Sequence, residues 1–408
     1  MAIKDRNIWK AMKMAMLILL CGISGSIFAE NKETAQNKEY TPEEQQELWK
    51  QPDFVRAYYV VAEPGGALYS IFGHACLHMV CEAYDLDYFF SYESENAASR
   101  FLKFLSGNLK MGMVRMKKED YLAVYIKEGR GVKEYELNLP IDVKRELWRV
   151  LDEKTDEGMY LSYDFETRGC AYACVTSINE ALGDKKIEYG DWSPRFIRTR
   201  REMCNDFGKW DYPWNMMLIM ALVGSDVDKI LTPEEKLIIP TEVAEVWQNA
   251  KVDGVFLLSR EAHVLSPSTK EKEQASWFTP TFAALILLLL AIIAFFVNAP
   301  YIDWLILVIV TLIGAFFTYL VVFSTLPCTN WNELIIPFNI LPAICWKWRK
   351  FWALSYAVLI GLWTACVIAS PHVLADNSMI VLAIAFIVIL LNKRNRKPLN
   401  LNKKNRKK

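Results

Sequence analysis

Two side chains far apart in the sequence have the types and settings that thiol chemistry needs. Cys170 follows Arg168 and Gly169, where an extended run meets the start of a predicted helix. The backbone N–H groups at a helix N-terminus favour the thiolate form of a cysteine. His74 lies where a turn runs into a predicted strand, and an imidazole beside a thiol serves as its general base. We therefore predict a catalytic pair in which Cys170 is the nucleophile and His74 the base.

Several residues near this pair are secondary candidates. His78 shares a strand face with His74 and Cys76, a possible zinc set, but the parallel side chains of one strand face converge poorly on an ion. We therefore predict no metal and no cofactor. Cys174 lies one helical turn after Cys170, a spacing typical of a buried core cysteine. The groups that could orient His74 are Asp87, Ser91, Tyr92, Tyr163 and Asp164.

The elements around these residues indicate an α+β domain. Strands come first along the chain and helices follow, which differs from the alternation of a parallel α/β fold. The predicted strands are 56–62, 74–80, 86–92, 112–116 and 132–138, and the predicted helices are 97–109, 140–154 and 170–182. Pro140 suits the start of a helix, and Gly183 suits an end.

The N-terminus resembles a secretory signal. Lys4, Arg6, Lys10 and Lys13 precede a short apolar run that ends in small residues at Ala29, the pattern of a signal peptide. We predict a signal peptide at 1–29, with an uncleaved anchor as the alternative, and an exported domain at 30–277. The exported domain holds five of the nine cysteines. Because five is odd, at least one thiol there should be unpaired in an oxidising compartment.

The C-terminal third is predicted to be a bundle of transmembrane helices at 278–392. Segments 282–297, 304–323, 352–370 and 378–391 are apolar and close to the length that spans a bilayer. The tail at 393–408 carries nine basic residues and no acidic one, which is typical of a cytoplasmic end rather than of nucleic-acid binding. A further crossing at 334–346 would put both the tail and a second basic cluster, Lys347, Arg349 and Lys350, on the cytoplasmic side, so four and five crossings are both open.

The segment 213–224 is apolar almost all round but too short to span a bilayer. It reads either as a buried helix or as a helix with one face in lipid.

Three motifs carry a resemblance to a known family. Residues 68–79 (LYSIFGHACLHM), 101–109 (FLKFLSGNL) and 163–170 (YDFETRGC) resemble, in order and spacing, motifs of the bacterial Lnb N-terminal periplasmic domain family. Arg168 and Gly169 stand where that family has Asp-Asn, and Ala75 stands where it has Thr. The resemblance covers about residues 50–190, and it implies that His74 is the base and Cys170 the nucleophile.

The resemblance also implies a fold, an activity and a location. The fold would be a circularly permuted papain-like thiol domain followed by the helical bundle. The activity would be that of a lipoprotein N-acyltransferase in the inner membrane, with its N-terminal domain in the periplasm, a phospholipid as acyl donor and a lipoprotein as acceptor. A membrane-anchored cysteine peptidase or amidase and a non-catalytic membrane sensor are the alternatives.

Overall fold

The computed structural model describes residues 41–49, 54–96, 99–159, 161–162, 169–190, 198–208, 211–229, 237–269, 277–297, 299–392 and 395. The predicted signal peptide, Tyr163 and the basic tail apart from Asn395 lie outside these residues.

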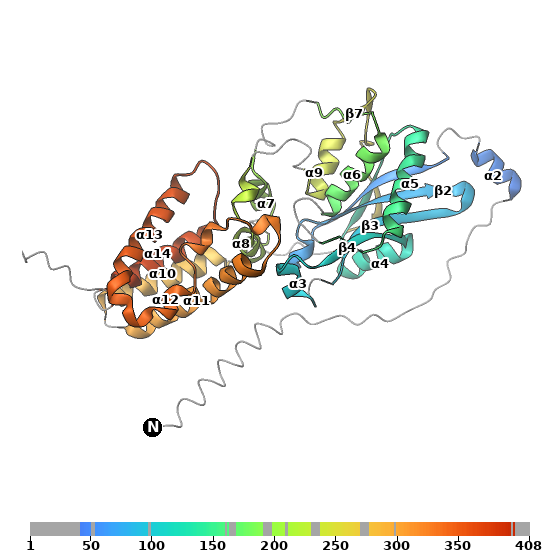
Figure 1. The fold of residues 1–408 in the computed structure, drawn as a ribbon. Coiled ribbons are helices and arrows are strands. Elements are labelled where there is room, and N and C mark those ends of the chain that lie inside the picture. The colour runs from blue at the N-terminus through green and yellow to red at the C-terminus, as the bar shows by residue number, and fades with distance from the viewer. Residues whose placement is uncertain are drawn as a thin grey trace, which may run out of the picture.

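An antiparallel sheet forms the centre of the N-terminal part (Figure 1). Its strands are, in spatial order, β6 (Leu161–Ser162), β4 (Lys110–Lys117), β3 (Leu86–Ser94), β2 (His74–Cys81), β1 (Arg56–Ala62), β5 (Val132–Glu136) and β9 (His263–Ser266). The central strands β1 and β2 are buried along nearly their whole length. Both faces of the sheet are therefore covered, which explains why β1 is apolar without alternation.

Helices cover the two faces of the sheet unequally. On one face, α5 (Ile141–Asp156), α6 (Cys170–Leu182) and α9 (Pro240–Trp247) enclose the main apolar core. On the other face lies α4 (Lys118–Glu128), whose Tyr121 ring stacks on Phe89 of β3. Outside these layers are α2 (Pro42–Trp49) and the hairpin of β7 (Lys251–Val252) and β8 (Val255–Phe256). A mixed fold with an antiparallel sheet confirms the predicted class for this part.

The predicted helix at 97–109 is much shorter in the structure. Among residues 99–109, which the structure describes, the helical ones are those of α3 (Phe101–Leu105). Gly107 adopts the left-handed conformation (φ 75°), which ends a helix and which residues other than glycine rarely adopt. β4 then begins at Lys110.

The C-terminal part is mostly helical. α10 (Pro280–Phe296), α11 (Pro300–Phe323), α13 (Arg349–Ala369) and α14 (Asn377–Leu391) share one apolar core. Two helices of the described chain, Pro300–Phe323 and Trp346–Ala369, are long and apolar enough to cross a membrane, whereas α10 and α14 are shorter.

Residues 324–348 connect opposite ends of this bundle without a continuous helix. They contain the short turns η6 (Pro327–Thr329), η7 (Glu333–Ile335), α12 (Leu341–Ile344) and η8 (Trp346–Trp348). The backbone of Asn339 packs on Gly314 in the middle of α11, with no room for a Cβ there. Trp346 then meets Trp304 at the start of α11, with ring centroids 6.0 Å apart. The segment thus runs the length of α11, but as an irregular chain.

Side chains satisfy the backbone of this irregular segment inside the bundle. The Asn339 amide donates to the Ile335 carbonyl at 3.0 Å, and the Tyr356 hydroxyl donates to the Ile336 carbonyl at 2.8 Å. Non-helical backbone at such a depth is tolerated only when it is buried in protein and its polar groups have partners.

Three short helices join the two parts of the chain. α3, α7 (Arg200–Gly208) and α8 (Pro213–Leu222) lie between the sheet and the bundle (Figure 1). Beyond α3, the carbonyl of Ser106 accepts a hydrogen bond from the Thr325 hydroxyl at 2.9 Å. At the end of α8, the carbonyl of Ala221 accepts one from the Asn332 amide at 2.7 Å. Both contacts anchor the N-terminal part to segment 324–348.

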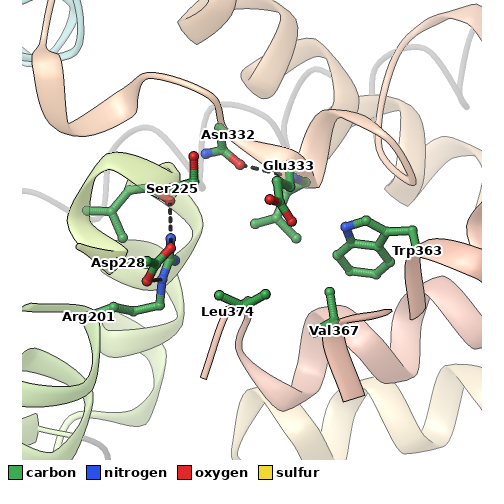
Figure 2. A pocket seen from close by; sticks show the side chains of 10 residues that line it. Arg201, Ser225, Asp228, Asn332, Glu333, Trp363, Val367 and Leu374 are labelled. Atoms are coloured by element: carbon green, nitrogen blue, oxygen red, sulfur yellow. Dashed lines mark hydrogen bonds and ion pairs between the residues drawn. The ribbon is translucent and has the colours of Figure 1, made fainter. Parts of the chain in front are cut away.

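Arg201 on α7 organises this junction. Its side chain is 3% exposed and pairs with Asp228 at 2.8 Å. It also donates to the carbonyls of Val223 (3.2 Å) and Gly224 (2.7 Å), just beyond the end of α8. Figure 2 shows the cavity beside it, which Trp363 of α13 lines on the other side. At about 10 Å³ this cavity holds about one water molecule, so it is no site for an acyl chain.

Candidate active site

Cys170 is the first residue of α6. The preceding Gly169 is extended (φ −76°, ψ 164°), and its carbonyl accepts the N–H of Ala173 at 2.9 Å. The first N–H groups of a helix have no acceptor within the helix, so they present positive charge to the thiol. As predicted, Cys170 therefore lies at a helix N-terminus, in a setting that favours its thiolate.

Cys170 also differs from the other described cysteines of the N-terminal part in its exposure. It is half-buried, whereas the others are buried, and all of them are free thiols. The buried ones are Cys76, Cys81, Cys174 and Cys204. Among them, Cys170 is the residue that is partly exposed.

His74 is the first residue of β2, opposite the last residue of β1. Gly73 before it has φ 80°, and a Cβ at this position would lie 2.6 Å from the carbonyl oxygen of Ala62. Only glycine fits, because both the conformation and the close approach exclude a side chain. The main chain at Gly73 thus fixes the backbone position of His74. The imidazole side chain is 17% exposed.

The fold brings the side chains of His74 and Cys170 close enough for each to shift the pKa of the other. Burial opposes ionisation of the thiol, but the charge and hydrogen bond of His74 and the backbone N–H of Ala75 outweigh it and lower the pKa of Cys170 from 9.0. Burial also opposes the charged imidazole, yet Tyr125, Cys170 and Glu93 raise the pKa of His74 well above 6.5. These opposite shifts favour a thiolate–imidazolium pair, which is the activated form of a cysteine nucleophile.

A hydroxyl and a carboxylate hold the other side of the imidazole. Nε2 of His74 lies 2.7 Å from the Ser91 hydroxyl, which donates to Oε1 of Glu93 at 2.5 Å. That oxygen lies 3.4 Å from Nε2. Burial opposes the charge of Glu93, but the charge and hydrogen bond of His74 and the hydrogen bond of Ser91 lower its pKa to about 2. A carboxylate can only accept hydrogen bonds, so the Ser91 hydroxyl donates to Glu93 and accepts a hydrogen bond from the protonated Nε2 of His74. Nδ1 is therefore the ring nitrogen that is left for the thiol.

Ser91 is among the predicted orienting groups, whereas Glu93 was missed. β3 runs on to Ser94, past the predicted end at 92. β2 and β3 pair with Cys76 opposite Ser91, and the same register extended by two residues sets Glu93 opposite His74. Alternation along β3 puts Ser91 and Glu93 on one face, a signal that points to the carboxylate once the register of β2 with β3 is known.

His78 has a different environment from His74. Its Nδ1 lies 2.6 Å from Glu134, and its Nε2 lies 2.8 Å from Asp87. Burial opposes the charged ring, but the hydrogen bonds with Asp87 and Glu134 raise its pKa from 6.5. Both ring nitrogens are engaged, and Asp87 contacts this histidine rather than His74. In the part of the chain that the structure describes, no three His, Cys, Asp or Glu side chains form a metal-binding group.

Cys174 lies in the main apolar core beneath α6. Burial is the main reason that the pKa of its thiol is raised well above 9.0. This cysteine therefore stays protonated and unreactive. Tyr163, the remaining secondary candidate, is outside the described residues.

The end of the sheet that carries His74 faces the bundle. The chain between β1 and β2 packs on α8: the Asn215 amide donates to the Gly66 carbonyl at 3.0 Å, and Ile71 shares an apolar cluster with Met216. β3 ends on the same side, one residue after Glu93, and leads into α3. The reactive pair therefore lies at the end of the domain that is nearest to the apolar helices.

Comparison with known families identifies the N-terminal part of the chain. Residues 43–200 match the family model described as the Lnb N-terminal periplasmic domain, which confirms the resemblance predicted from the motifs, and this part of the chain is an Lnb-type domain. No curated protein and no solved structure matches the chain. With the two helices that can cross a membrane, the match indicates a membrane protein whose N-terminal domain is periplasmic, an enzyme of Lnb-like lipoprotein processing.

Proposed function

We propose that this chain, whose residues 43–200 form an Lnb-type domain, is a lipoprotein N-acyltransferase of papain-like fold. It would move a fatty acyl chain from a phospholipid to the α-amine of a diacylated lipoprotein cysteine. The observation that carries the proposal is the approach of His74, at the start of β2, to Cys170, at the start of α6, at the bundle-facing end of the sheet. An activated thiol beside apolar helices suits esters that are anchored in a membrane. The histidine strand precedes the cysteine helix in the sequence, which is the order expected of a permuted papain-like domain.

The first step is acylation of the enzyme. The Cys170 thiolate attacks the ester carbonyl of the phospholipid, a C–S bond forms, and the C–O bond to the glycerol breaks. The His74 imidazolium gives its proton to the departing glycerol oxygen, so a lysophospholipid and an S-acyl enzyme result. Ser91 and Glu93 hold the imidazole in the tautomer that serves this transfer.

The second step is transfer to the acceptor. The neutral α-amine of the lipoprotein attacks the thioester carbonyl, an amide bond forms, and the C–S bond breaks. His74 takes the proton of the amine, and the pair returns to the thiolate–imidazolium form. Splitting the reaction in this way predicts ping-pong kinetics.

We further propose a multi-pass protein of the inner membrane. The domain at 30–277 would lie in the periplasm, the crossings in 278–392 and the basic tail in the cytoplasm. The course of the chain supports five crossings: α10, α11, segment 324–348, α13 and α14 run alternately between the two ends of the bundle. An odd number leaves residues 393–408 on the side opposite to the domain, in agreement with the positive-inside rule.

The test is mass spectrometry of lipoprotein N-terminal peptides from cells whose only copy is wild type, Cys170→Ala or Cys174→Ala. Cys174 is the matched control, since it lies one turn further along the same helix but is buried in the core. We expect free-amine, diacylated peptides with Cys170→Ala alone. Full acylation in all three strains would overturn the proposal. In vitro, a hydroxylamine-sensitive acyl mass on the Cys170 peptide would identify the intermediate.

A further inference from the structure

Exposed aromatic residues mark one end of the bundle, next to the N-terminal domain. Trp277 is 78% exposed, and Phe278 and Phe282 are each 41% exposed. Their rings contact one another, and Phe278 also meets Trp214 of α8 at 5.7 Å. Clustered aromatic side chains at the ends of apolar helices are typical of the membrane–water interface. This cluster therefore marks the level of the membrane surface.

α8 lies at this level and reaches the chain that leads to His74. The indole N–H of Trp214 donates to the Phe278 carbonyl at 2.8 Å, which ties α8 to the entry of α10. The side-chain amide of the next residue, Asn215, donates a hydrogen bond to the Gly66 carbonyl in the connection from β1 to β2. Leu218 on the same helix is 43% exposed. The interface and the active-site strand thus share one short apolar helix.

α3 reaches the same level from another side. Phe101 is 46% and Leu102 66% exposed, whereas Leu105 of the same helix is buried in the apolar core of the bundle. The carbonyl of Leu102 accepts from the Tyr319 hydroxyl, near the end of α11, at 3.4 Å. The exposed Lys103 between the apolar residues adds the cationic group that is typical of segments at a lipid surface.

We propose that α3 and α8 lie in the outer leaflet and take up the acyl chains of the donor phospholipid directly from the bilayer, beside the strands that carry His74 and Glu93. This inference rests on the proposed acyl transfer for the identity of the ligand. The occupant is lipid rather than a protein partner, because both helices continue the apolar surface and the packed core of the bundle. Exposed apolar side chains that continue the lipid-facing surface of the bundle are expected to lie in lipid as well.

Photo-crosslinking tests where these helices lie. Full-length protein with benzoylphenylalanine at Leu102 is reconstituted into bilayers of radiolabelled phospholipid. Ile126 is the matched control, since it is 60% exposed on α4, which packs on the sheet. We expect labelled lipid on the protein derivatised at 102 and none at 126. Equal labelling at both positions, or none at 102, would overturn the inference.

Kinetics test whether the lipid contact serves the reaction. The S-acylation rate of Cys170 is measured with phospholipid in bilayers and with a water-soluble short-chain ester. For Leu102→Asn we expect the ratio of the two rates to fall about 10-fold, the effect of removing one buried leucine from an apolar contact. For Ile126→Asn we expect the wild-type ratio. A wild-type ratio in Leu102→Asn would overturn the inference.

The two experiments separate this inference from the proposed function. If Cys170 forms no S-acyl adduct with either donor in the wild-type protein, the proposed function fails, and the role of α3 in donor uptake falls with it even if residue 102 is labelled by lipid. If the adduct forms and residue 102 is not labelled, the proposed acyl transfer stands, and the inference that α3 and α8 take up lipid from the bilayer is overturned.

Discussion

The Ser91 hydroxyl lies 2.7 Å from Nε2 of His74 and joins the imidazole to a carboxylate that is anchored on the same strand as the serine. Glu93, which accepts the hydrogen bond of the serine, has its pKa lowered to about 2, chiefly by the charge of His74, although its partial burial opposes the charge. The carboxylate thus stays ionised throughout the pH range in which the thiol reacts. Its charge stabilises the imidazolium, and the imidazolium in turn stabilises the Cys170 thiolate.

Replacement of Glu93 should slow acylation without changing the fold. In Glu93→Gln the imidazolium loses its negative partner, so we expect the S-acylation rate of Cys170 to fall by about 100-fold. Glu95→Gln is the control, because Glu95 follows the same strand but pairs with Arg100. Intact-protein mass spectrometry over time measures both rates. Equal rates in Glu93→Gln and wild type would show that the carboxylate plays no part.

Alkylation of Cys170 should follow the lowered pKa of its thiol. We expect the iodoacetamide rate, followed on the Cys170 peptide, to reach half its plateau below pH 9.0, because His74 favours the thiolate. In His74→Asn that charge is gone while burial remains, so the midpoint should move upward. A midpoint that is the same in both proteins would contradict the ion pair.

The elements that carry the pair could be predicted because their signals are local. Gly169 and Gly183 bound the helix that begins at Cys170, and the structure has this helix over the predicted residues. Gly73 marks the start of the histidine strand in the same way. The approach of His74 to Cys170 joins β2 and α6, and it was predicted from the residue types and their local settings together with the family motifs, because no spacing along the chain indicates it.

What the sequence did not yield depends on register and packing. Glu93 approaches His74 only because β2 and β3 pair with Cys76 opposite Ser91, and no local signal sets that register. The sequence left 334–346 open as a further crossing, but the irregular path of that segment depends on Asn339 fitting against Gly314. Both features arise from contacts between segments that are distant in sequence.

A methyl group at Gly224 should loosen the junction between the domain and the bundle. A Cβ there would lie 1.7 Å from the Asn330 carbonyl oxygen, which belongs to the segment beyond α11. We expect Gly224→Ala to lower the Tm of the purified protein by several degrees, since overpacking costs about 1–3 kcal/mol. Gly361→Ala is the control, because a Cβ in that turn of α13 meets nothing within 4 Å. A Tm as high as that of the control would refute this packing.

His78 should prove structural rather than catalytic. Its side chain is 3% exposed, and its partner Glu134 is 8% exposed. His78→Asn leaves that buried carboxylate without its cation, so we expect a loss of about 3 kcal/mol or more in stability. Asp87 is 44% exposed, and Asp87→Asn should cost about 1 kcal/mol or less because water screens this pair.

The pKa of His78 is raised from 6.5, so the contribution of its charge to the stability of the fold is complete below about pH 6.5 and is lost as the pH rises through the raised value. The Tm difference between wild type and His78→Asn should therefore be larger at about pH 6 than at about pH 9. The fraction of His78→Asn that stays folded should still form the S-acyl adduct at Cys170. Loss of the adduct at unchanged Tm would instead assign His78 to the reaction.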